Sequence, residues 1–169
     1  MLERKIMNPR TLHQRDGKSA LSLRADGMFE GYASIFGLVD LGGDQVAPGA
    51  FAQSLARRSA RQVRMLWQHD PAAPIGSWLS IEEDWRGLKV KGQLNLAVAR
   101  AREALALLRE GAVDGLSIGF RVKTARKMAS GGVRRLVELD LWEISIVTFP
   151  MLPQARITAV KRAVETHVH

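Results

Sequence analysis

The run from Val133 to Phe149 contains neither glycine nor proline, and its apolar residues recur at every second position. Five of them define the pattern, with Val137, Leu139 and Leu141 on one face and Ile144 and Ile146 on the opposite one. Period two is the spacing of a β-strand, whose successive side chains point to opposite faces. The change of face at Trp142 and Glu143 predicts either a β-bulge there or a strand that is buried on both faces. In both cases Glu143 lies in a partly desolvated place, which costs free energy unless a partner binds its carboxylate.

The rest of the chain adds further strands and few helices. Period-two patterns bounded by turn residues predict strands over 28–36, 63–69, 75–81, 88–96 and 116–124, and a short strand over 157–160. Helical spacing of apolar residues predicts helices over 52–58 and 97–110, and Gly111 lies where the second helix should stop. We therefore expect an α+β domain that is mainly β, with about six to seven strands and the helices around them.

Length and composition place this pattern in a single domain. A chain of 169 residues can bury most of its apolar surface in one core, and the absence of cysteine excludes disulfides, thiol nucleophiles and thiolate metal sites. Residues 1–26 are polar and carry no pattern, so we expect a flexible N-terminal arm, the folded domain over 27–160 and a frayed tail over 161–169. No apolar stretch approaches the roughly 18 residues of a membrane-spanning helix. No secretory signal is visible either, which predicts a cytoplasmic protein.

Two polar residues, His69 and Ser117, stand out because they lie inside apolar runs. The remaining histidines, which are His13, His167 and His169, occupy polar or terminal stretches. His69 instead continues the apolar face of the 63–69 strand, so we expect its imidazole to extend that face; the alternative is a histidine that is simply satisfied in the core. Ser117 lies on the more polar face of the 116–124 strand beside Gly119, whose missing side chain leaves room for a substrate carbonyl.

Together these residues are the parts of a nucleophilic hydrolase. A hydroxyl attacks, an imidazole takes its proton, and a carboxylate holds the imidazole in the right tautomer. Ser117, His69 and Glu143 supply these groups, although an ordinary ion pair to an arginine is the alternative for Glu143. The order His, Ser, Glu differs from that of chymotrypsin, subtilisin and the α/β-hydrolases, so the arrangement requires another fold. One embedded histidine is too few for a histidine-rich metal site, and we expect neither metal nor cofactor.

The chain is also strongly basic, with 25 lysines and arginines against 17 acidic residues and a formal net charge of +8. The cations form clusters, which are Arg57, Arg58, Arg61 and Arg64, then Arg121, Lys123, Arg126 and Lys127, then Arg134 and Arg135. Such clusters are usually solvated faces, and the alternative is an electrostatic handle for an acidic partner, which we expect at the 57–64 cluster. Aromatic residues do not interleave with the cations and no nucleic-acid-binding motif is present, so specific nucleic-acid binding is not expected.

In these same residues the sequence resembles the prohead maturation protease family of tailed phages, whose fold is related to that of the herpesvirus assemblin proteases. The resemblance covers roughly residues 31–160. Its motifs occur in matching order and are Gly31-Tyr32-Ala33-Ser34, Asp40 and Gly43-Asp44 before Pro48-Gly49-Ala50-Phe51, Trp67-Gln68-His69, Gly115-Leu116-Ser117-Ile118-Gly119-Phe120, and Glu143-Ile144-Ser145-Ile146-Val147 before Pro150. The resemblance implies an assemblin-like β-barrel and a serine endopeptidase. Such an enzyme works inside the immature capsid in the host cytoplasm, where it cleaves scaffold or the scaffold-like segment of the major capsid protein, and eventually itself.

The resemblance also implies roles for individual residues. His69 would be the base and Ser117 the nucleophile. The assemblin relatives use a second histidine as third member, and since this chain has no well-placed one, Glu143 is the natural replacement. Asp70 is next to His69 and poorly aimed at its ring, and Asp114 precedes the serine strand and suits a turn, yet both remain alternatives. The competing function is an inactive protease fold that assembles capsids or binds scaffold, and a homodimer or higher oligomer is a further expectation.

Overall fold

The computed structural model describes residues 26–129 and 131–161. Nearly all of the expected N-terminal arm (1–26) and C-terminal tail (161–169) therefore lies outside the described residues, as do His13, His167 and His169. No helix in the described ranges is long and apolar enough to cross a membrane.

The described chain is mainly β, which confirms the expected class. Its eight strands are β1 (Met28–Ile35), β2 (Asp44–Val46), β3 (Arg64–Trp67), β4 (Asp70–Glu83), β5 (Gly87–Leu94), β6 (Gly115–Lys127), β7 (Arg134–Val147) and β8 (Ile157–Val160). The helices are α2 (Ala52–Arg57) and α3 (Ala99–Glu110), with a 3-10 turn, η2 (Ala60–Gln62), after α2. The strand count exceeds the expected six to seven because β2, with 3 residues, is too short to show a period in the sequence.

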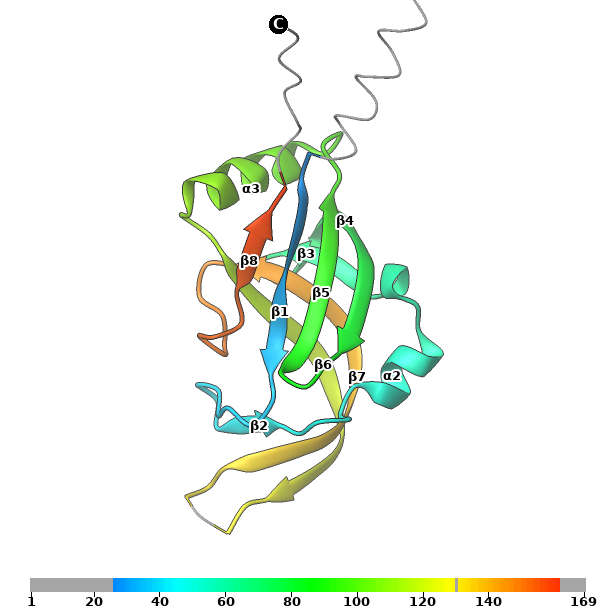
Figure 1. Ribbon diagram of the computed structural model, residues 1–169, viewed down its shortest axis with the longest axis vertical. Helices are drawn as coiled ribbons and strands as arrows, with labels where there is room; N and C mark the ends of the chain where they lie inside the picture. Colours follow the sequence, from blue (N-terminus) through cyan, green and yellow to red (C-terminus); the bar gives the residue numbers. More distant parts are fainter. Residues whose placement is uncertain (1–25, 130, 162–169) are drawn as a thin grey trace, which may run out of the picture.

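All strands belong to one curled sheet in the order β2-β7-β3-β4-β5-β1-β8, and β6 pairs with the other edge of β7. The sheet curls far enough to bring its ends together. Leu116 of β6 donates its backbone N–H to Ala155 at 2.9 Å, and Ile157 of β8 donates to Asp114 at 2.8 Å. Figure 1 shows the strands wrapped around the core, with α3 at one end and the tip of the β6–β7 hairpin, in yellow, at the other.

The core lies inside the curl of the sheet. Its largest fully buried side chains include Trp78, Phe51 and Met65, and the Trp78 ring packs edge-on against Phe29 at 5.5 Å between centroids. The helix α3 closes one end by burying a stripe of apolar residues, namely Ala101, Ala104, Leu105 and Leu108. It ends at Gly111, whose left-handed backbone (φ 79°) is the conformation that favours glycine after a helix.

The long strand β7 contains the predicted change of face. In its antiparallel pairing with β6, Glu143 lies opposite Gly119 and Leu141 lies opposite Phe120, so Trp142 is an extra residue without a partner. This is a β-bulge, which confirms one of the two alternatives from the sequence. After the bulge the strand is regular, so Glu143 lies on the same face of the sheet as Ser145, two residues later, while Ile144 and Ile146 on the other face are fully buried.

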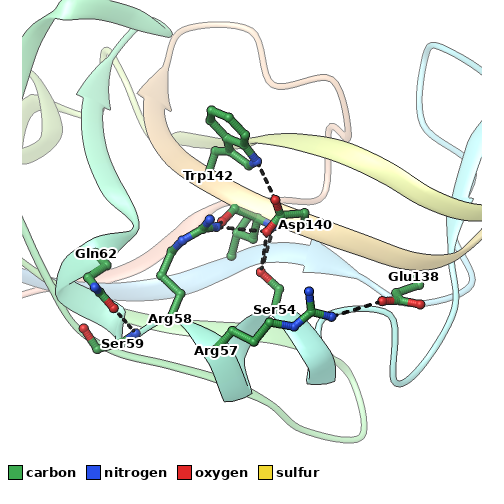
Figure 2. A network of polar contacts seen from close by, with 9 residues as sticks. Ser54, Arg57, Arg58, Ser59, Gln62, Glu138, Asp140 and Trp142 are labelled. Atoms are coloured by element: carbon green, nitrogen blue, oxygen red, sulfur yellow. Dashed lines mark hydrogen bonds and ion pairs between the residues drawn. The ribbon is translucent and has the colours of Figure 1, made fainter.

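Side chains of α2 occupy the edge of β7 between β2 and β3 (Figure 2). Leu141 donates its N–H to Ser54 Oγ at 2.9 Å, and its carbonyl accepts a hydrogen bond from Arg58. Arg58 also pairs with Asp140 at 3.1 Å, and Asp140 accepts the indole N–H of Trp142 at 2.8 Å. Ser54 of α2 and Arg58, the residue directly after the helix, thus satisfy the backbone groups of Leu141 that a neighbouring strand would otherwise bind, directly beside the bulge.

This packing corrects one expectation from the basic clusters. Arg58 is bound to β7, with 29% of its side chain exposed, and Arg57 forms an ion pair with Glu138 at 3.6 Å. Arg58 is therefore not free to act as an electrostatic handle, whereas Arg61 and Arg64 of the same cluster are exposed. Reversing the charge of Arg58 would break contacts inside the fold.

Candidate active site

The site is built on three adjacent strands, β3, β7 and β6. Ser117 of β6 lies opposite Ser145 of β7, and Gly119 lies opposite Glu143. On the other edge of β7, β3 runs parallel and pairs Leu66 with Ser145. The two-residue turn that follows β3 carries His69. The sheet thus brings together three segments that are far apart in the sequence.

His69 lies in a turn, which corrects the expectation of a strand over 63–69. The strand β3 ends at Trp67, which pairs directly with Asp70 of β4, so Gln68 and His69 form a two-residue hairpin loop. Both have left-handed backbones, with φ of 52° and 60°. Positive φ at both loop residues matches the right-handed twist of a hairpin, but the usual residues there are asparagine, aspartate and glycine. Gln-His carries no such signal, and the imidazole does not continue the apolar face.

Three contacts hold this strained turn in place. The backbone N–H of Gln68 donates to Ile146 at 3.0 Å, and the Gln68 side chain exchanges two hydrogen bonds with Thr148, at 2.7 and 3.2 Å. The backbone N–H of His69 donates to Ser145 Oγ at 3.1 Å. A non-glycine residue in the left-handed region costs about 1–3 kcal/mol and persists only where its surroundings impose it. The end of β7 therefore fixes the position of the imidazole.

The imidazole is bound to a carboxylate that is itself fixed. His69 Nδ1 hydrogen-bonds Glu143 Oε1, and Glu143 Oε2 accepts a 2.6 Å hydrogen bond from Ser145 Oγ. Ser145 is fully buried, and the Glu143 side chain is 14% exposed. The hydrogen bond that His69 Nδ1 donates to Glu143 raises the pKa of His69 above its ordinary 6.5, against the lowering effect of partial burial. With Nδ1 engaged, Nε2 is the ring nitrogen left to exchange a proton.

Gly119 provides the space in which the Glu143 side chain lies. A Cβ atom added at Gly119 would approach the Cγ and Cδ atoms of Glu143 to 2.8 Å, well inside van der Waals contact. This corrects the expectation that the missing side chain leaves room for a substrate carbonyl beside Ser117. The room is taken by the carboxylate that binds His69.

Ser117 and His69 line the same cleft, which has a volume of about 240 Å³. Ser117 is 8% exposed. The walls are mostly apolar and include Ala33, Ile35, Leu38, Val46, Phe120 and Met151. The two loops that form one wall are joined by a 3.0 Å hydrogen bond from the Leu41 N–H to the Met151 carbonyl. A peptide with an apolar side chain could enter this cleft and bring a carbonyl to Ser117.

The two alternative carboxylates are engaged elsewhere. Asp70 Oδ1 accepts the backbone N–H of Ala72 at 2.8 Å, as in an ordinary turn. Asp114 Oδ1 pairs with Arg156 at 2.5 Å, where β6 meets the segment before β8. Within residues 26–129 and 131–161, no three histidine, aspartate or glutamate side chains are grouped as metal ligands.

Sequence reasoning missed the residues that position the site. Ser145, Gln68 and Thr148 carry the hydrogen bonds that orient Glu143 and the turn. A signal for Ser145 was present, since it follows Glu143 by two positions and therefore shares its strand face. The Gln68–Thr148 pair joins residues 80 positions apart and could not be foreseen without the register of β3 against β7.

The sequence is similar to that of known phage proteins. Residues 16–169 match the family described as caudovirus prohead serine protease. The chain is 40% identical over 138 residues to the prohead protease of Enterobacteria phage HK97, covering 80% of this chain and 60% of that relative. It is 32% identical over 105 residues to a capsid polyprotein of Pseudomonas phage PAJU2, covering 59% of this chain and 16% of the polyprotein.

The fold is also found among solved structures. The capsid assembly protease of bacteriophage T4 superposes with a TM-score of 0.55 at 12% sequence identity, covering 71% of this chain and 80% of that one. At this identity the likeness concerns the fold alone. The chain spans less than two thirds of the length of the HK97 relative.

Proposed function

The chain belongs to the caudovirus prohead serine protease family, and we propose that it is a serine endopeptidase in which Ser117 is the nucleophile, His69 the general base and Glu143 the acidic member of the triad. We assign this activity to a domain over residues 27–160. The observation that carries the proposal is the chain of contacts from Ser145 through Glu143 to His69, beside a cleft that also contains Ser117.

The proposed reaction follows from the contacts of His69. Ser117 Oγ attacks the carbonyl carbon of the scissile peptide bond while its proton moves to His69 Nε2. The tetrahedral intermediate collapses when the imidazolium gives that proton to the leaving amine, and an acyl-enzyme on Ser117 remains. A water molecule, deprotonated by His69, then hydrolyses the ester and restores the hydroxyl.

Glu143 would act through the imidazole and not on the substrate. Its bond to Nδ1 keeps that nitrogen protonated and Nε2 unprotonated, which is the tautomer a general base requires. The same carboxylate stabilises the imidazolium that forms during attack, consistent with the raised pKa of His69. Ser145 would be a positioning residue, because its hydroxyl holds both Glu143 and the backbone of His69.

The proposed substrates are the scaffold or the scaffold-like segment of the major capsid protein, cleaved inside the immature capsid, and the enzyme itself. The similarity to the prohead protease of phage HK97 supports this assignment. The PAJU2 relative supports it independently, since there the matching sequence is part of a capsid polyprotein. We also propose that the enzyme assembles as a homodimer or a higher oligomer.

Co-expression with the cognate major capsid protein tests this function. Mass determination should find truncated capsid protein with the intact chain and full-length capsid protein with a Ser117→Ala chain. Equal truncation in both experiments would overturn the assignment of Ser117. Full-length capsid protein in both, with the two proteins recovered in one particle, would favour the competing function of an inactive protease fold that assembles capsids or binds scaffold.

A further inference from the structure

The tip of the β6–β7 hairpin carries a group of cations that the proposed chemistry does not use. We call it the basic arm, and it consists of Lys123, Arg126, Lys127, Arg134 and Arg135. It forms the end of the molecule opposite α3 (Figure 1). In this part of the two strands the side chains are exposed or half-buried, apart from Leu136, which belongs to the core.

The strand register places like charges directly opposite each other on the basic arm. Arg126 lies opposite Arg135, and Lys127 lies opposite Arg134. Of the ion pairs among the described residues, only one reaches this group, the two-pronged contact of Arg134 with Asp44 at 2.8 Å. Cross-strand pairs of like charge destabilise a hairpin. The arrangement therefore lowers the stability of the arm unless an anion binds between the strands.

A shallow hollow beside the arm combines charge with apolar surface. It measures about 590 Å³, and Arg126, Lys127 and Arg135 supply its charged lining. Pro48, Met128 and Val137 contribute apolar surface. Neither a carboxylate nor an aromatic ring belongs to the described residues that line it.

We propose that the basic arm is a docking site for an acidic segment of a partner polypeptide, with carboxylates on both sides of an apolar side chain. The carboxylates would pair with the unpartnered arginines and remove their mutual repulsion, and the apolar side chain would cover Met128 and Val137. The apolar surface favours a peptide over nucleic acid, since a strand of nucleotides would find phosphate partners there but no ring on which to stack a base.

Both strands of the hairpin run from the basic arm to the active site. Ser117 and Arg126 are both on β6, and their nine-residue separation corresponds to about 30 Å of strand. A segment docked on the arm would hold its polypeptide near the cleft and raise the local concentration of a bond to be cut. This site is separate from Ser117, so it goes beyond the proposed reaction and can be tested without it.

Fluorescence anisotropy of a short labelled peptide, in which glutamates flank a leucine, measures this binding directly. The full chain carries Ser117→Ala throughout so that the peptide stays intact. The arm variant adds Arg126→Gln and Arg135→Gln, and a matched control adds Lys89→Gln and Lys91→Gln, which remove the same charge from exposed positions on β5. We expect the arm variant to weaken binding about tenfold at low salt, the control to change it little, and a glutamine-for-glutamate peptide to bind to none of the chains.

Three results would overturn the proposal. Equal weakening by the arm variant and the lysine control would mean that net charge alone attracts the peptide. Unchanged binding by the arm variant would place the site elsewhere, and tighter arm-dependent binding of a single-stranded oligonucleotide than of the peptide would make it a phosphate site. Thermal unfolding of each variant checks the fold, and the arm variant should melt no lower than the parent because a like-charge pair is removed. Should it melt lower, Arg126→Gln and Arg135→Gln tested singly must each still weaken binding.

Discussion

Replacement of Ser145 by alanine tests how the site is held together. The Ser145 hydroxyl is fully buried, donates to Glu143 at 2.6 Å and accepts the His69 N–H at 3.1 Å. A hydrogen bond to a charged group contributes about 1.5–3 kcal/mol. Since about 1.4 kcal/mol corresponds to a tenfold change in rate, and Glu143 keeps its bond to His69, we expect Ser145→Ala to lower kcat by about 10- to 100-fold.

The effect should fall on kcat and leave KM nearly unchanged, because Ser145 acts on Glu143 and His69 and not on the substrate. Steady-state hydrolysis of a peptide substrate across a range of pH gives both constants and the midpoint of the acid limb. That midpoint should fall, since a less well held Glu143 raises the pKa of His69 by less. Urea unfolding should show that Ser145→Ala lowers the free energy of unfolding by about 1–3 kcal/mol.

Ser54→Ala is the matched control. This serine is also buried on the edge of β7, where it accepts the Leu141 N–H at 2.9 Å, but it does not contact His69 or Glu143. It should cost similar stability and leave kcat and the pH profile nearly unchanged. If Ser145→Ala kept wild-type kcat, or if both variants lost activity only in proportion to their stability, the positioning role of Ser145 would be refuted.

Four further predictions concern the same network. Glu143→Gln should lower kcat by about 10⁴, as the equivalent change does in the chymotrypsin-type triad. If Glu143→Gln had almost no effect on kcat while Asp114→Asn abolished activity, Asp114 and not Glu143 would be the acidic member of the triad. Gly119→Ala should displace the Glu143 carboxylate and lower kcat while the chain still folds, as kinetics and circular dichroism would show. In wild type, kcat/KM should rise with pH around a midpoint above 6.5, because neutral His69 is the base and its pKa is raised. The His69–Glu143 contribution to stability should be complete below pH 6.5 and be lost as pH rises through that raised pKa; pH-independent stability in this range would contradict it.

The alternation of apolar residues along β7 predicted the environment of Glu143, because that environment depends on the pattern of one strand. The change of face at Trp142 located the bulge, as the pairing of β6 with β7 confirms. It also predicted a partly desolvated place for Glu143, whose side chain is 14% exposed. The position of His69 could not be predicted this way. The pattern of residues 63–69 continues smoothly through the imidazole, whereas the chain turns at Gln68 because β4 pairs back onto β3.

The basic clusters in the sequence did not predict which arginines bind partners within the fold. The sequence marks Arg58 and Arg126 as members of similar clusters, yet Arg58 binds Asp140 and a backbone carbonyl while Arg126 faces another arginine. The difference arises from tertiary packing, because α2 lies against the open edge of β7 and brings Arg58 to that edge. Arg126 lies on the basic arm, away from α2. The partners of a cation therefore depend on tertiary packing and strand register, neither of which a cluster of basic residues in the sequence reveals.

Covalent labelling of the full chain with a fluorophosphonate tests whether His69 activates Ser117 as the nucleophile. Such a reagent phosphonylates a serine hydroxyl that a neighbouring base activates, and peptide mass spectrometry locates the adduct. We expect a single adduct, on Ser117, forming at a rate that rises with pH above 6.5 and that falls by several orders of magnitude in His69→Ala. An adduct on a different serine, or labelling of Ser117 at the same rate without His69, would contradict the account.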